Sequence, residues 1–114
     1  MTRLFRVIFW AATAFALVMA LLPQPPQLPG SPSDKVQHIL AFAALACLGS
    51  VAYRSASSIA LLTGLSAFGA VIELLQAIPA LNRDSDAVDW LADTIAAGLV
   101  LVAIRWWRSR QEAH

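Results

Sequence analysis

The chain has 114 residues and a net charge of +1, with 59% hydrophobic and only 13% charged residues. Soluble domains carry about a quarter charged residues, so this composition and a mean hydropathy of +0.66 indicate an integral membrane protein. A single domain, residues 1–114, is expected from this length. The small net charge, without a basic face, argues against nucleic-acid binding.

The first predicted transmembrane span covers residues 4–22 and follows Arg3 and Arg6. Its length, roughly 19 residues, is enough to cross a bilayer. A cleaved signal peptide is the rival interpretation, because a basic segment precedes the apolar run. Further apolar runs follow, so the protein stays in the membrane under either interpretation. Residues 23–34 are rich in proline and are predicted to form an external loop, because no helix continues through such a run.

Three more spans are predicted, at about residues 35–53, 59–78 and 86–107. The link between the second and third spans is short, which is typical of antiparallel neighbours. The predicted fold is therefore all-α, a polytopic integral membrane protein with four transmembrane helices in a compact bundle. Cys47 lies in an apolar run, and its simplest interpretation is a small buried hydrophobic residue.

The orientation follows from the basic residues. With four spans, both termini and the link between the second and third spans share one side of the membrane. Six basic residues fall on that side and two on the other, which predicts cytoplasmic termini. Aromatic residues are expected in interfacial belts, with Trp90 in the outer one. The six are Arg3, Arg6, Arg54, Arg105, Arg108 and Arg110, and the two are Lys35 and Arg83.

Polar residues enter three spans from the outer side. Asp86, Asp89 and Asp93 fall at i, i+3 and i+7, which places them on one face of a helix. His38 lies about one turn, roughly 6 Å, inside the second span, and Glu73 lies at a similar depth in the third. Because a charged group is costly in lipid, these side chains are expected to turn into the bundle or a wet crevice.

Each of these residues also has a structural interpretation. The aspartates that open the last span are suited to capping that helix and complementing its dipole. Lys35 is able to extend its amine to the interface, and His38 to serve as a hydrogen-bonded packing residue. Glu73 is the hardest to explain this way, because it lies inside an apolar helix.

Three motifs of this chain resemble those of the VanZ-like family of small bacterial membrane proteins, over roughly residues 34–98. The motifs are Asp34-Lys35-x-x-His38, Glu73-x-x-Gln76 and Arg83-x-x-Asp86-x-x-Asp89-x-x-Ala92-Asp93. The chain departs from the family at Asp93, where the family often has Asn, and at Ala96, where it often has Gly. The resemblance implies a protein of the bacterial cytoplasmic membrane with a cell-envelope role, linked to glycopeptide (teicoplanin-type) tolerance.

The first functional hypothesis is a polar, acidic site in the outer leaflet that binds or processes a lipid-linked or phosphate-bearing envelope precursor. Catalysis remains open, as do a metal ion held by His38 and carboxylates, and the oligomeric state. Alternatives are an accessory protein whose ionic cluster locks the bundle, and a small proton-coupled transporter. Acid–base or ligand roles are expected for Glu73, His38 and Asp89, and binding roles for Asp34, Lys35, Gln76, Arg83, Asp86 and Asp93.

Overall fold

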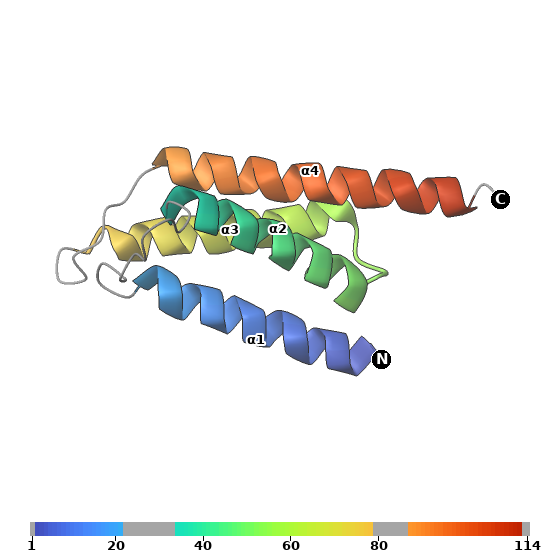
Figure 1. Ribbon diagram of the computed structural model, residues 1–114, viewed down its shortest axis with the longest axis horizontal. Coiled ribbons are helices and arrows are strands. Elements are labelled where there is room, and N and C mark those ends of the chain that lie inside the picture. The colour runs from blue at the N-terminus through green and yellow to red at the C-terminus, as the bar shows by residue number, and fades with distance from the viewer. Residues whose placement is uncertain (1, 22–33, 79–86, 113–114) are drawn as a thin grey trace.

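A computed structural model describes residues 2–21, 34–78 and 87–112. It contains four helices: α1 (Thr2–Leu21), α2 (Asp34–Ala52), α3 (Ser58–Gln76) and α4 (Ala87–Glu112). The helices run alternately in opposite directions, so α1 starts and α4 ends at the same end of the bundle (Figure 1). The expected all-helical bundle is confirmed. Of the predicted loop, residues 23–34, residues 23–33 lie outside the described part of the chain, and Asp34 belongs to the first turn of α2.

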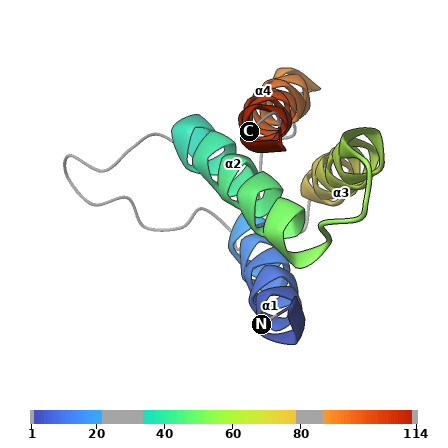
Figure 2. The same ribbon diagram turned by 90° about the vertical axis from the view of Figure 1, so that its right-hand side faces the viewer.

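Helix α2 lies in the middle of the bundle and contacts α1, α3 and α4 (Figure 2). Small side chains allow this central position, because Ala46, Ala52 and Ala97 are completely buried at the contacts. Larger residues fill the remaining space of the core. They are Phe9, Phe42, Leu45, Leu65, Ile72 and Leu101.

Two glycines lie at close contacts between helices. A Cβ atom added to Gly49 in α2 would lie 3.1 Å from the ring of Phe9 in α1. One added to Gly69 in α3 would lie 3.2 Å from Trp90 in α4 and 3.3 Å from Phe42 in α2. A side chain at either position would therefore force the neighbouring aromatic rings to shift, which explains why glycine suits these contacts.

The surface of the bundle is apolar enough to face lipid. Helices α1, α3 and α4 are long and apolar enough to cross a membrane, and the apolar part of α2, Val36–Ala52, is shorter. Its 17 residues rise roughly 25 Å, at the lower end of the length that spans a bilayer. Cys47 is exposed on α2, so its expected burial is wrong. Large exposed apolar side chains include Val7, Phe15, Leu40, Ile59, Leu74, Leu91, Leu99 and Val102.

The C-terminal end of α2 is fastened by arginines from its two neighbours. Arg6 of α1 donates from Nε to the carbonyl of Ala52 at 3.1 Å, and Arg108 of α4 donates to the carbonyl of Ser50 at 3.0 Å. Both carbonyls lie in the last turn of α2, where backbone carbonyl groups lack hydrogen-bond donors within their own helix. The positive guanidinium groups also complement the negative end of the helix dipole.

Candidate functional site

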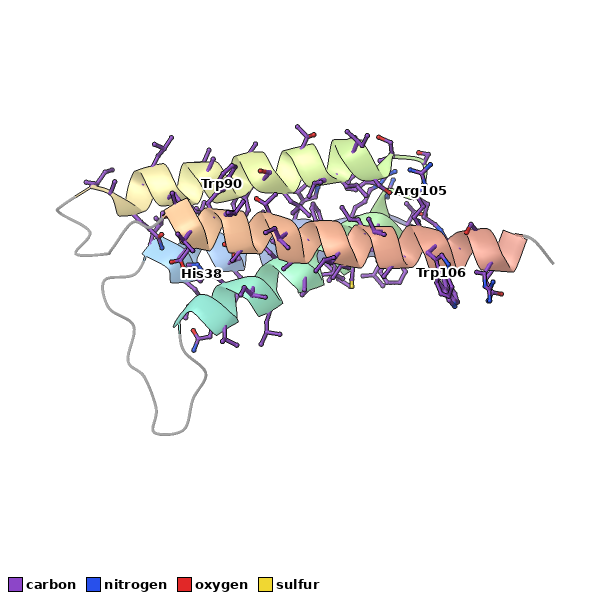
Figure 3. The ribbon with its side chains drawn as sticks, turned by 90° about the horizontal axis from the view of Figure 1, so that it is seen from above. His38, Trp90, Arg105 and Trp106 are labelled. Atoms are coloured by element: carbon purple, nitrogen blue, oxygen red, sulfur yellow. The ribbon has the colours of Figure 1, made fainter. Side chains whose placement is uncertain are left out.

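The polar residues identified in the sequence that fall within the described part of the chain, His38, Glu73, Gln76, Asp89 and Asp93, lie toward one end of the bundle. We call this the polar end; there α1 ends at Leu21, α2 begins at Asp34, α3 ends at Gln76 and α4 begins at Ala87. The opposite end, where α2 stops and α3 starts, is the arginine end. Figure 3 shows His38 and Trp90 in the half of the bundle at the polar end, away from Arg105 and Trp106.

Glu73, Gln76 and Asp93 point into the bundle and not to lipid. Their exposed fractions are 9%, 2% and 3%. Asp89 is half-buried, and one side-chain oxygen of both Asp89 and Asp93 is shielded from solvent. This burial fits the cost of a carboxylate at membrane depth, which is lowered inside a bundle. The carboxylates of Glu73 in α3 and Asp93 in α4 thus both lie in the interior toward the polar end.

Gln76 connects α3 to α1. Its Nε2 donates a hydrogen bond to the backbone carbonyl of Ala20 at 2.9 Å, and both residues are buried. The carbonyl of Ala20 lies in the last turn of α1, where it lacks a partner within the helix. The amide of Gln76 therefore caps α1 and sets its position at the polar end. The predicted ligand-binding role of Gln76 stays a prediction.

His38 lines a pocket between α1 and α2. The pocket has a volume of about 350 Å³, and His38 and Gln37 supply its polar side chains. Its walls are mostly apolar, a composition that is typical of sites for small amphiphilic ligands. Ala20 and Ile72 also line it, so it borders the residues next to Gln76 and Glu73. The apolar wall includes Phe15, Met19, Phe42 and Leu45.

The start of α4 is held against α3 by polar contacts that sequence reasoning missed. The indole nitrogen of Trp90 donates to the carbonyl of Ser66 at 2.9 Å, and the hydroxyls of Ser66 and Thr94 lie 3.2 Å apart. Trp90 is half-buried and packs on Gly69, so it holds α4 against α3, and its expected place in the outer interfacial belt stays a prediction. Hydroxyl residues in apolar spans commonly hydrogen-bond across helices, which is the signal that points to Ser66 and Thr94.

Several predicted site residues lie outside the described part of the chain. Arg83 and Asp86 are among them, and so are the side chains of Asp34 and Lys35, whose backbone opens α2. Within residues 2–21, 34–78 and 87–112, no three histidine, cysteine or acidic residues are grouped so that they can hold a metal ion.

Comparison of the chain with protein-family models, with curated proteins and with solved structures finds no match. The resemblance to the VanZ-like family therefore remains a prediction from the three motifs. What the structure contributes is the arrangement of the polar end: buried Glu73, Gln76 and Asp93 on α3 and α4, and an amphiphilic pocket beside His38.

Proposed function

We propose that this protein binds a lipid-linked or phosphate-bearing precursor of the bacterial cell envelope at its polar end. In this proposal the protein lies in the cytoplasmic membrane, with both termini in the cytoplasm. The pocket beside His38 is the observation that carries the proposal, because apolar walls and a polar edge match a ligand with a hydrocarbon chain and a polar headgroup.

The chemistry of the polar end supports this choice of ligand. His38 stands at the pocket, where its imidazole is able to hydrogen-bond a phosphate or sugar group or to move a proton. The buried carboxylates of Glu73 and Asp93 supply further acceptors in the same half of the bundle. Asp89 extends this set at the start of α4. Lys35, in the first turn of α2, and Arg83, which precedes α4 in sequence, are the cations we expect to neutralise a phosphate.

An accessory role without a ligand is the second candidate. The hydrogen bond from Gln76 to Ala20 and the burial of Glu73 and Asp93 favour it, because polar groups in a bundle interior also fix helix positions. The two roles differ in what a mutation changes. If the polar residues only stabilise the bundle, removing one partner lowers the stability of the protein. If they form a binding site, removing one lowers the affinity for the ligand.

The experiment measures binding of a radiolabelled polyprenyl phosphate to the full chain in detergent. We expect saturable binding that His38→Ala weakens and that Ala44→Trp blocks, because Ala44 lines the pocket and is exposed. Leu40→Trp is the matched control, since Leu40 lies one turn earlier on α2, is 58% exposed and is not part of the pocket wall. Equal binding by all three variants overturns the proposal.

The proposed link to glycopeptide tolerance rests on the VanZ-like motifs and is tested in cells. A sensitive bacterium that expresses the chain should tolerate a higher teicoplanin concentration than one carrying an empty vector. His38→Ala should remove that gain, while Leu40→Trp should keep it. If expression of the native chain leaves teicoplanin tolerance unchanged, the proposed link to glycopeptide tolerance is wrong. The binding measurement then tests the site independently.

A further inference from the structure

We propose that the arginine end holds an anionic phospholipid, with the phosphate among Arg54, Arg105 and Arg108 and one acyl chain in the groove between α3 and α4. This site lies at the other end of the bundle from His38, and it does not depend on the proposed function. Figure 3 shows Arg105 and Trp106 toward the C-terminal part of α4.

The first observation is a basic pocket of about 410 Å³. The three arginines line it together with hydroxyl groups, and none of the described residues that line it is acidic. Arginine forms strong, often bidentate hydrogen bonds with phosphate oxygens, and serine hydroxyls add weaker donors. The hydroxyl residues are Ser50, Ser57, Ser58 and Ser109.

The arginines retain donors for a ligand. Arg108 donates to the carbonyl of Ser50 at 3.0 Å, which fixes its position and uses only part of the five N–H groups of a guanidinium. Arg54 and Arg105 are exposed, and within the described part of the chain neither makes a hydrogen bond or an ion pair. Three positive charges without a lining carboxylate favour an anion in the pocket.

The start of α3 also faces this pocket. Ser57 caps the helix, since its hydroxyl accepts the N–H of Ala60 at 3.0 Å, and both Ser57 and Ser58 line the pocket. The N-terminus of a helix carries partial positive charge, so it adds to the attraction that the arginines exert on a phosphate.

The second observation identifies a lipid as the source of the phosphate. An apolar groove of about 420 Å³ runs between α3 and α4 and shares Ser58, Leu101, Arg105 and Ser109 with the basic pocket. From Arg105 it reaches Gly98, roughly 10 Å along α4. A cation-lined pocket that opens into an apolar groove matches a headgroup and its acyl chain. The groove is otherwise lined by Ile59, Leu62, Val102 and Trp106.

The depth of the arginines in the membrane is consistent with this assignment. From Ala87 to Arg105, α4 rises roughly 27 Å, close to the thickness of the hydrocarbon core. Arg105 and Arg108 therefore reach headgroup level. The excess of basic residues predicts that the arginine end lies at the cytoplasmic face. Clustered cations at that face attract anionic lipids.

The experiment counts lipids bound to the full chain by native mass spectrometry after titration with phosphatidylglycerol, phosphatidylcholine or inorganic phosphate. We expect one tightly bound phosphatidylglycerol, weaker phosphatidylcholine binding, and no competition from inorganic phosphate at the lipid concentration. Equal affinity for the two lipids overturns the proposal. Displacement of the lipid by inorganic phosphate at that concentration would assign the pocket to free phosphate and overturn the lipid source.

Two matched pairs of variants locate the site. Arg105→Gln should weaken phosphatidylglycerol binding about tenfold, the loss of one charge-assisted hydrogen bond, whereas Arg3→Gln at the same end should not. Gly98→Leu should block the groove, while Gly64→Leu should have no effect, because a Cβ at Gly64 meets nothing within 4 Å. Equal losses within either pair contradict the assigned position, and helical circular dichroism verifies that each variant is folded.

Discussion

Gln76 of α3 donates a buried hydrogen bond of 2.9 Å to the carbonyl of Ala20 in α1. Phe9 and Ala20 of α1 are buried, and Phe5, Ala12, Ala16 and Leu17 pack against the core from partly buried positions. The bond adds a directional contact to this apolar packing at the polar end. It also fixes one wall of the pocket beside His38, because Ala20 lines that pocket.

Gln76→Leu should lower the stability of the bundle. The substitution keeps most of the side-chain volume but leaves the carbonyl of Ala20 without its donor, which costs about 1–3 kcal/mol in a buried site. The measurement is the melting temperature in detergent. Leu74→Ala is the control, since Leu74 is 72% exposed and should change stability by less than about 0.5 kcal/mol. Equal melting of the two variants would contradict this role of Gln76.

Gly69→Ala and Gly64→Ala should change stability in opposite directions. At Gly69 the new Cβ would meet Trp90 at 3.2 Å and Phe42 at 3.3 Å, and overpacking of this kind costs about 1–3 kcal/mol. At Gly64 nothing lies within 4 Å, so alanine should stabilise α3 by up to about 1 kcal/mol through its helix propensity. Melting temperatures of the two variants check this, and a stabilised Gly69→Ala protein would disprove the close contact.

The sequence predicted the fold because long apolar runs without alternation leave a membrane chain little choice but helices. It predicted less about where helices end. Helix α4 reaches Glu112, beyond the expected residue 107, and Arg108 in its last turns bonds to Ser50 of α2. The run of arginines after the apolar segment predicted the end of the span, whereas the helix itself continues through Arg105, Arg108 and Arg110.

For the candidate site, burial was predictable and partners were not. A charged group such as Glu73 in an apolar helix has to turn inward, and it does. The acceptors of Gln76 and Trp90 are the backbone carbonyls of Ala20 and Ser66, and every residue carries a carbonyl, so sequence gives no sign of the partner. Cys47 is exposed, and its expected burial was wrong because apolar composition alone does not distinguish the lipid-facing side of a helix from the interior side.

The topology is testable with reporter fusions. We expect fusions after Leu28 and Ala80 to report as external, and fusions after Ser57 and His114 as internal. The reason is the excess of basic residues on the side that holds both termini, and the alternating helix directions place these termini at one end of the bundle (Figure 1). An external C-terminus would contradict this topology and move the basic pocket to the outer leaflet.

Glu73→Gln separates binding from scaffolding. If Glu73 belongs to a buried ionic lock, its neutralisation removes one partner of a charge pair, which typically costs about 3–5 kcal/mol. If it belongs to a working site, it is kept for the ligand at some expense of stability. We expect the second result: a melting temperature equal to or above that of the native protein, together with loss of the teicoplanin phenotype and of polyprenyl phosphate binding.

Leu65→Ala is the packing control for this experiment. Leu65 is 5% exposed, lies on α3 and does not line the pocket beside His38, and its truncation should cost about 2–5 kcal/mol by leaving a cavity. Both variants are compared in the same membrane preparations for yield, melting temperature and binding. A Glu73→Gln protein that fails to accumulate, as the control is expected to, would assign the carboxylate to the structural lock. One that melts normally and still binds would remove Glu73 from the site.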